Sequence, residues 1–191
     1  MRKLTSKAED ARKNRRNQIF LGMILVFIML FSVLGYSFQG NVGENAESTD
    51  KINYNGFEFT KQGDFWLLNK NEINFIFKNN PKEVSAIYFS GKLIDYENKM
   101  LYVYSESAEA ESEIRANMFQ FVAGIENACP ENSNCSGNLP VKKCDENFII
   151  IKESEEERIT RDMNCIFLEG SGEELIKVAD EFLFNILDVR Q

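Results

Sequence analysis

The feature of this sequence that most constrains its fold is a stretch without charged side chains over residues 19–36. The apolar core of a bilayer is about 30 Å thick, and a helix needs roughly 20 residues to cross it. Residues 37 and 38 extend the stretch to that length. A buried helix of a soluble domain would keep a polar face, and this stretch has none. We therefore predict a transmembrane helix over residues 19–38, with the lipid bilayer as its partner.

The charges on either side of this stretch predict its orientation. A cluster of four basic residues lies immediately before it: Arg12, Lys13, Arg15 and Arg16. No basic residue follows before Lys51, so the positive-inside rule keeps residues 1–18 in the cytoplasm. Residues 39–51 are rich in Gly, Asn and Glu and predict a flexible linker. The predicted location is the cell membrane, with one span, a basic cytoplasmic tail and an exported domain over residues 52–191.

Two other interpretations of the apolar stretch stay open. A cleaved signal peptide has an apolar region of about 7–15 residues followed by small residues, and this stretch is longer and lacks such a site. A pilin-like filament subunit also begins with a basic leader and an apolar helix. However, no Gly or Ala processing site follows the arginines, and no Glu lies early in the stretch. An uncleaved anchor fits the residues best.

The charge balance differs between the tail and the rest of the chain. Residues 1–18 carry seven basic and two acidic side chains, a net charge of +5 within a total of −8. Residues 19–191 therefore carry −13. A domain this acidic repels phosphate groups, so we predict no nucleic-acid partner. It is also not expected to lie flat on anionic lipid.

The predicted exported domain begins with strands and continues with two mixed units. Alternating apolar residues predict a β-meander of three short strands over residues 54–60, 65–68 and 73–77. The later elements are strand material around 85–89 and 92–94, a strand at 100–104, a helix at about 108–128, strands at 148–151 and 159–168, and a helix at 171–187. Ser171 and Glu174 predict a capping box at the second helix. The predicted fold class is α+β, an antiparallel sheet with two helices packed on one face and the order β-meander, then ββα-ββα.

All four cysteines lie in the predicted exported domain, at Cys129, Cys135, Cys144 and Cys165. An even number in an oxidising exterior predicts two disulfides, for which three pairings exist. We favour Cys129–Cys135, which closes a polar loop. We also favour Cys144–Cys165, which become opposite if a hairpin turns at Ser154 and Glu155; a slip of one residue destroys that match. A four-thiolate zinc site is the alternative, but the chain has no Cys-x-x-Cys pair.

The sequence contains no motif that predicts catalysis or a cofactor. It has no His, the side chain most often used for general acid–base chemistry near neutral pH. It also lacks the nucleophile elbow, the P-loop and the dinucleotide-binding glycines. We predict no catalytic residue, no cofactor and no metal. The alternative is a membrane-tethered hydrolase that uses carboxylates, with Glu109 or Glu111 as candidates.

Aromatic residues concentrate in the predicted meander. Four consecutive apolar residues form one of its strands: Phe65, Trp66, Leu67 and Leu68. Consecutive residues of a strand point to opposite faces of the sheet, so one face of this strand fills the core and the other carries exposed apolar groups. We predict a possible interaction surface at these four residues.

The layout and the segments NPKEV, ACPENSNC and NCIF resemble uncharacterised single-pass membrane-anchored proteins predicted from small archaeal genomes. This resemblance implies an anchor followed by a domain, and no known activity. Together with the missing catalytic motifs, it leads us to expect a membrane-anchored extracytoplasmic domain. We expect this domain to be a binding or assembly module of the cell envelope with an unknown protein partner.

Overall fold

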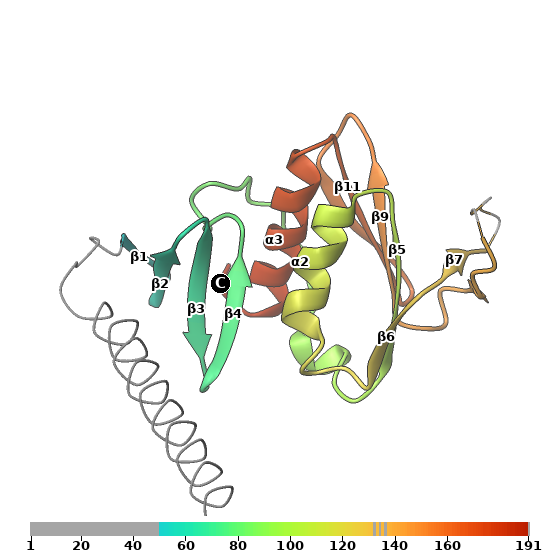
Figure 1. Ribbon diagram of the computed structural model, residues 1–191, viewed down its shortest axis with the longest axis horizontal. Coiled ribbons are helices and arrows are strands. Elements are labelled where there is room, and N and C mark those ends of the chain that lie inside the picture. Colours follow the sequence, from blue (N-terminus) through green and yellow to red (C-terminus); the bar gives the residue numbers. More distant parts are fainter. Residues whose placement is uncertain (1–49, 132, 134, 136, 191) are drawn as a thin grey trace, which may run out of the picture. The chain divides into compact units, whose positions relative to one another are not determined.

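The computed structural model describes residues 50–190 apart from 132, 134 and 136 (Figure 1). Thr49–Gln191 form one compact unit. The predicted cytoplasmic tail, the transmembrane helix over residues 19–38 and the linker up to residue 49 lie outside the described residues and stay predictions. Within the described part, neither helix combines the length and the hydropathy that a membrane span requires.

A four-stranded antiparallel meander opens the unit. Its strands pair in chain order: β1 (Lys51–Tyr54), β2 (Phe57–Gln62), β3 (Phe65–Lys70) and β4 (Ile73–Phe77). The predicted meander is confirmed, with one strand more than expected. Residues 54–60 are not one strand, because Asn55 and Gly56 form a tight turn with positive φ angles of 47° and 84°. Asn-Gly is the pair that two-residue hairpin turns favour, so the sequence did carry this signal.

A second, five-stranded sheet is mostly parallel, which corrects the prediction of a single antiparallel sheet. Its spatial order is β10-β11-β9-β5-β6, and only β10 runs antiparallel to its neighbour. The strands are β5 (Met100–Ser105), β6 (Gly124–Asn127), β9 (Phe148–Glu153), β10 (Arg158–Asp162) and β11 (Cys165–Gly170). The continuous apolar run in β9 is typical of a parallel strand that is buried on both faces. Three small elements complete the unit: η1 (Leu93–Asp95), β7 (Cys129–Pro130) and β8 (Val141–Lys142).

The two helices, α2 (Ala108–Met118) and α3 (Glu174–Ile186), form a layer between the two sheets (Figure 1). α2 contacts β4 and β5, and α3 contacts β9, β10 and β11. The fold class is α+β as predicted, but the helices are covered by a sheet on both sides. The helix predicted over 108–128 is too long, because its last part forms β6. The predicted capping box at α3 is absent: Ser171 accepts through its main-chain oxygen from the N–H of Glu174 (2.8 Å).

The main core extends from the meander through the helix layer to the parallel sheet, and its part beside the meander is rich in phenylalanine. Phe77 and Phe184 have ring centroids 4.7 Å apart, and Phe59 packs against both at 6.0 and 5.8 Å. These three side chains are fully buried. Aromatic pairs of this kind stabilise a fold by about 0.5–1.5 kcal/mol beyond the area they bury. The core therefore joins β2, β4 and α3 directly.

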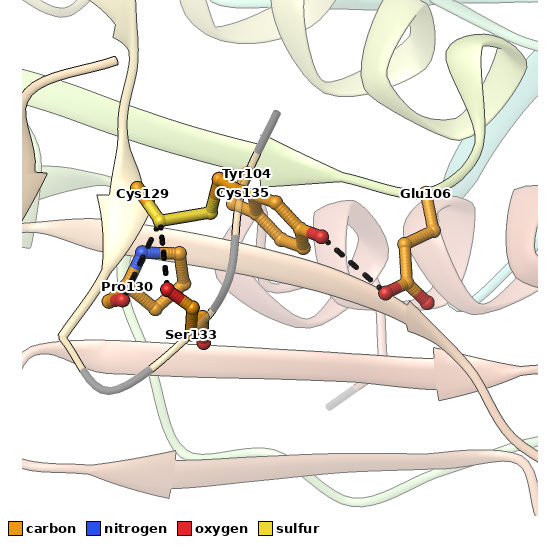
Figure 2. The surroundings of a disulfide bond; sticks show 6 residues. All are labelled: Tyr104, Glu106, Cys129, Pro130, Ser133 and Cys135. Atoms are coloured by element: carbon orange, nitrogen blue, oxygen red, sulfur yellow. Dashed lines mark hydrogen bonds between the residues drawn. A yellow bond between two sulfur atoms is a disulfide. The ribbon is translucent and has the colours of Figure 1, made fainter. Parts of the chain in front are cut away.

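Both predicted disulfides are present, Cys129–Cys135 and Cys144–Cys165. Figure 2 shows the first of them with Pro130 and Ser133 of the loop that it closes. The second pairing is right, but the hairpin that suggested it is wrong. β9 and β11 are parallel neighbours with Phe148 opposite Cys165. Cys144 lies just before β9, where its carbonyl accepts from the N–H of Asn164 (3.0 Å), and this brings it to Cys165.

Side chains of α2 occupy the edge of β4 in place of a fifth strand. Asn117 donates through Nδ2 to the carbonyl of Ile76 (2.7 Å) and accepts through Oδ1 from the same residue's N–H (2.9 Å). Glu113 accepts from the N–H of Lys78 (3.0 Å). The side chains thus satisfy a buried strand edge that would otherwise leave main-chain groups unpaired.

Side chains of α3 bind the main chain of a second extended segment in a similar way. Residues 85–89, predicted as strand material, have no sheet partner in the structure, and most of the material predicted at 92–94 lies in η1. Instead Glu181 accepts from the N–H of Ile87 (3.1 Å). Asn185 donates to the carbonyl of Ile87 (3.0 Å) and accepts from the N–H of Phe89 (3.2 Å). Each helix therefore uses a Glu-x-x-x-Asn pair to bind the main chain of a neighbouring segment.

The variant Asn117→Ala tests this joint. It leaves the N–H and the carbonyl of Ile76 without their partners, and an unpaired buried group costs about 1–3 kcal/mol. We expect urea titration of the fragment 49–191 to show a loss of about 2–4 kcal/mol in the free energy of unfolding. The matched control is Asn69→Ala, because Asn69 bonds to Asn74 on the exposed surface. Equal losses in the two variants would contradict this role.

Candidate functional site

A cleft of about 530 Å³ opens where strands of both sheets end and both helices begin. We call it the strand-end cleft. Its polar lining comes from the ends of β4, β5 and β9 and from the starts of α2 and α3: Lys78, Asn79, Glu106, Ser107, Glu109, Glu153, Glu173 and Lys177. The topology explains its position. From β5 the chain passes through α2 to β6, which pairs with one side of β5. The other side of β5 pairs with β9, which lies next to β11. In open parallel sheets, ligands bind outside the carboxyl ends of strands at such a point.

Most of the charged side chains that line the strand-end cleft are acidic. Glu106 accepts through Oε2 from the N–H of Glu153 (2.9 Å), which holds the ends of β5 and β9 together. Ser107 caps α2 by accepting from the N–H of Ala110 (3.3 Å). Lys177, one of the two lysines of the lining, pairs with Glu174 at 2.7 Å. This distribution disfavours anionic ligands.

The two glutamates predicted for a hydrolase do not act together. Glu109 lines the strand-end cleft. Glu111 pairs with Arg115 at 2.7 Å. A carboxylate-dependent hydrolase needs two acidic groups on either side of one bond. The structure therefore places only one of the two candidates in the cleft.

A pair of buried carboxyls from the two helices lies next to the cleft-lining residues Lys78 and Asn79. Asp180 of α3 is fully buried, and Glu113 of α2 is nearly so. Asp180 accepts through Oδ2 from both the N–H and the side-chain amide of Asn79 (2.9 Å each). Its other oxygen, Oδ1, finds no donor among the described residues. The pair therefore fixes the position of two residues that line the cleft.

The surroundings of this pair favour its protonated form. Burial raises the pKa of Asp180 well above its ordinary value, and the charge of Glu113 raises it further. Burial also raises the pKa of Glu113, while its hydrogen bond to Asp180 and the N–H of Lys78 act in the opposite direction. A proton on Asp180 lets this carboxyl donate to Glu113, which two ionised carboxylates cannot do. We therefore expect the pair to share a proton.

The predicted interaction surface divides between the two faces of β3. Trp66 is 5% exposed and Leu68 is 1% exposed, and both belong to the core. Phe65 is 46% exposed, and Leu67 is half-buried. Ile76 of β4, which the prediction missed, lies beside Leu67 and is 43% exposed.

We call Phe65, Leu67 and Ile76 the meander face. Lys78 borders it, with Nζ 5.2 Å from the centroid of the Phe65 ring. The alternation in residues 73–77 carried the signal for Ile76, because it places this residue on the face opposite Phe75 and Phe77. Of the four predicted residues, Phe65 and Leu67 therefore lie on this face, and Trp66 and Leu68 lie in the core.

Comparisons of the chain with family models, with curated proteins and with solved structures found no match. Fold and sites together define a disulfide-linked α+β domain in which helices separate two sheets. Within the described residues, no group of three or more acidic or cysteine side chains is arranged to hold a metal ion. The function is therefore argued from the surfaces themselves.

The variant Asp180→Asn tests the shared proton. An acid whose pKa is raised by folding contributes most to stability below its unfolded pKa of about 3.9, and this contribution is lost as the pH rises through its folded pKa. The amide keeps an acceptor for Asn79 and adds a donor for Glu113. We expect the variant to be more stable than the wild type at pH 8, with a smaller difference at pH 5.

Urea midpoints of the fragment 49–191 between pH 5 and pH 8 measure this effect. Asp64→Asn, in the exposed turn after β2, is the control. A variant that is less stable than the wild type at pH 8 would show that Asp180 is ionised and needed as such.

Proposed function

We propose that this chain is a single-pass membrane-anchored protein. Its extracytoplasmic domain is a binding or assembly module of the cell envelope. The apolar stretch at residues 19–38 and the preceding basic residues support the anchor and its orientation. The two disulfides support an oxidising location for the domain, because thiols stay reduced in the cytosol.

The meander face is the contact surface of this module. One face of the meander is packed against the helix layer, and the other carries Phe65 and Ile76 with more than two fifths of each side chain exposed. This observation carries the proposal, because clustered apolar groups on a solvent-facing sheet are typical of protein contacts. The partner is a protein of the same membrane or envelope.

The small size of the meander face agrees with a tethered protein. A stable complex between soluble proteins buries about 800 Å² on each partner, which three partly exposed side chains do not supply. Confinement to one membrane raises the effective concentration of two partners, so a weak contact suffices. A small contact and a membrane anchor are therefore consistent with each other.

A tethered hydrolase is the second candidate, favoured by the position of Glu109 in the strand-end cleft. Binding is better supported because Glu113 and Asp180, whose pKa values are raised by burial, are engaged in holding the chain at the end of β4. Buried groups of this kind do not reach a substrate.

The double variant Phe65→Asp, Ile76→Asp tests the contact surface. It places two charges on the meander face. We expect the yield of the complex between this protein and its partner, recovered after chemical cross-linking of native membranes, to fall roughly tenfold or more. Tyr88→Asp is the control, because Tyr88 is 89% exposed and belongs to none of the meander strands. Unchanged recovery of the complex in the double variant would exclude the meander face as its contact.

The topology has its own test. Non-reducing peptide mapping of protein from its native membrane is expected to recover Cys129–Cys135 and Cys144–Cys165 as linked peptides. In intact cells, a membrane-impermeant maleimide is expected to label Ser48→Cys in the linker and to leave Ser6→Cys in the tail unlabelled. The opposite labelling pattern, or four free thiols, would place the domain in the cytoplasm.

A further inference from the structure

Among the described residues, the meander has one open edge, at β1. The N–H of Lys61 donates to the carbonyl of Asp50 (2.8 Å), and the register places Ile52 opposite Phe59. In an antiparallel pair, every second residue directs its main-chain groups to the partner strand. Asp50, Ile52 and Tyr54 therefore bond to β2, while Lys51 and Asn53 direct their N–H and carbonyl groups outward. No described residue bonds to those outward groups.

The opposite edge of the same sheet is treated differently. There the Glu113 and Asn117 side chains satisfy β4, as described above. A strand edge with unpaired groups is a template for another strand, and proteins usually cover or distort it. β1 contains no proline, its register is continuous, and Lys51 and Asn53 are exposed. The charge of Lys51 is already engaged by Glu58 of β2 at 2.9 Å.

We propose that β1 pairs antiparallel with β1 of a second copy of this chain, about a two-fold axis through Ile52. In this register Lys51 of each copy exchanges main-chain hydrogen bonds with Asn53 of the other. Ile52, whose own main-chain groups bond to β2, meets its counterpart as the non-hydrogen-bonded pair between them. The two four-stranded meanders thereby become one continuous antiparallel sheet.

The side chains of β1 fit a second copy in this register. Lys51 lies beside Asn53 of the other copy, so the two lysines do not face each other. Ile52 is half-buried against the core, and its counterpart extends the same apolar face. The alternation of outward main-chain groups has its centre at Ile52, so the edge is complementary to itself, as an isologous contact requires.

The pairing goes beyond the proposed function, and its geometry does not depend on the membrane anchor. Its strength does depend on the anchor, because a four-residue strand buries too little area for a stable soluble dimer. Two copies in one membrane have a higher effective concentration. We therefore expect the dimer in membranes and a largely monomeric fragment in dilute solution.

Cysteine cross-linking of the full chain tests the register. Copies with Lys51→Cys and copies with Asn53→Cys, carrying different tags, are produced together in the native membrane and treated with a mild oxidant. Hydrogen-bonded partners in an antiparallel pair have Cα atoms about 5.5 Å apart, within the range of a disulfide. In contrast, the same residue in the two copies is offset by two positions along the paired strands. This offset adds about 6.8 Å between the two Cα atoms, which exceeds the range of a disulfide.

The expected result is a disulfide-linked species near twice the chain mass of 22.0 kDa in the mixed sample and not in either single-variant sample. The absence of a linked dimer from all three samples would overturn the proposal. This absence is the result expected if the linker of the same chain covers β1. Equal yields in all three samples would also overturn it, because they would report random collision.

A second variant separates this proposal from the proposed function. Asn53→Pro removes an outward N–H without disturbing the bonds between β1 and β2. We expect it to abolish self-association, measured by stepwise photobleaching of labelled full-length chains in membranes. It leaves the meander face intact, so the complex sensitive to Phe65→Asp, Ile76→Asp is expected to persist. Retained self-association would overturn the edge pairing and leave the proposed function standing.

Discussion

The described domain depends on how its two helices bind the main chain of their neighbours. Because the meander packs beside helices, the N–H and carbonyl groups at the edge of β4 face a layer that contains no strand with which they could pair. The Asn117 amide pairs with both main-chain groups of Ile76, because one amide presents a donor and an acceptor. The Asn185 amide pairs in a similar way with the carbonyl of Ile87 and the N–H of Phe89. Without these amides, β4 and the segment around Ile87 would meet the helices through unpaired polar groups.

The same solution explains why the helix layer contains acidic residues at its centre. Glu181 binds Ile87 and also Arg190, which in turn contacts Tyr54 of β1 and thereby ties the end of the chain to the meander. Burial raises the pKa of Glu181, and Arg190 counteracts this effect. Among the described residues, no such cation acts on Asp180, and burial together with the charge of Glu113 raises its pKa. We therefore expect stability to vary with pH at the joint that also shapes the strand-end cleft.

The two edges of the meander show how this joint relates to assembly. The edge inside the domain is covered by side chains, and the edge at β1 is left open beside the linker. The meander face and the open edge belong to the same sheet, so contacts with a partner and with a second copy would use one element. The parallel sheet, in contrast, is braced by the disulfide between Cys144 and Cys165 and by the small cluster around Phe148 on its outer face.

Local patterns predicted the strands of the meander, the two helices and both disulfides, because alternation, helical periodicity and cysteine number are properties of neighbouring residues. They did not predict the parallel sheet. Ile125 continues the periodicity of α2, yet it lies in β6, because pairing with β5 outweighs local helix preference there. Cys144 and Cys165 were paired correctly for a wrong reason, since strand direction depends on a crossover that no local pattern encodes.

The sequence by itself determined the apolar stretch at residues 19–38, the acidic character of the rest and the four apolar residues of β3. Only the tertiary structure decided that Trp66 is core and Phe65 is surface, that Glu113 and Asp180 meet, and that β1 keeps an open edge. The physical reason is distance along the chain. Hydrophobic pattern and charge act between near neighbours, whereas burial, shared protons and unpaired strand edges arise from segments that only the fold brings together.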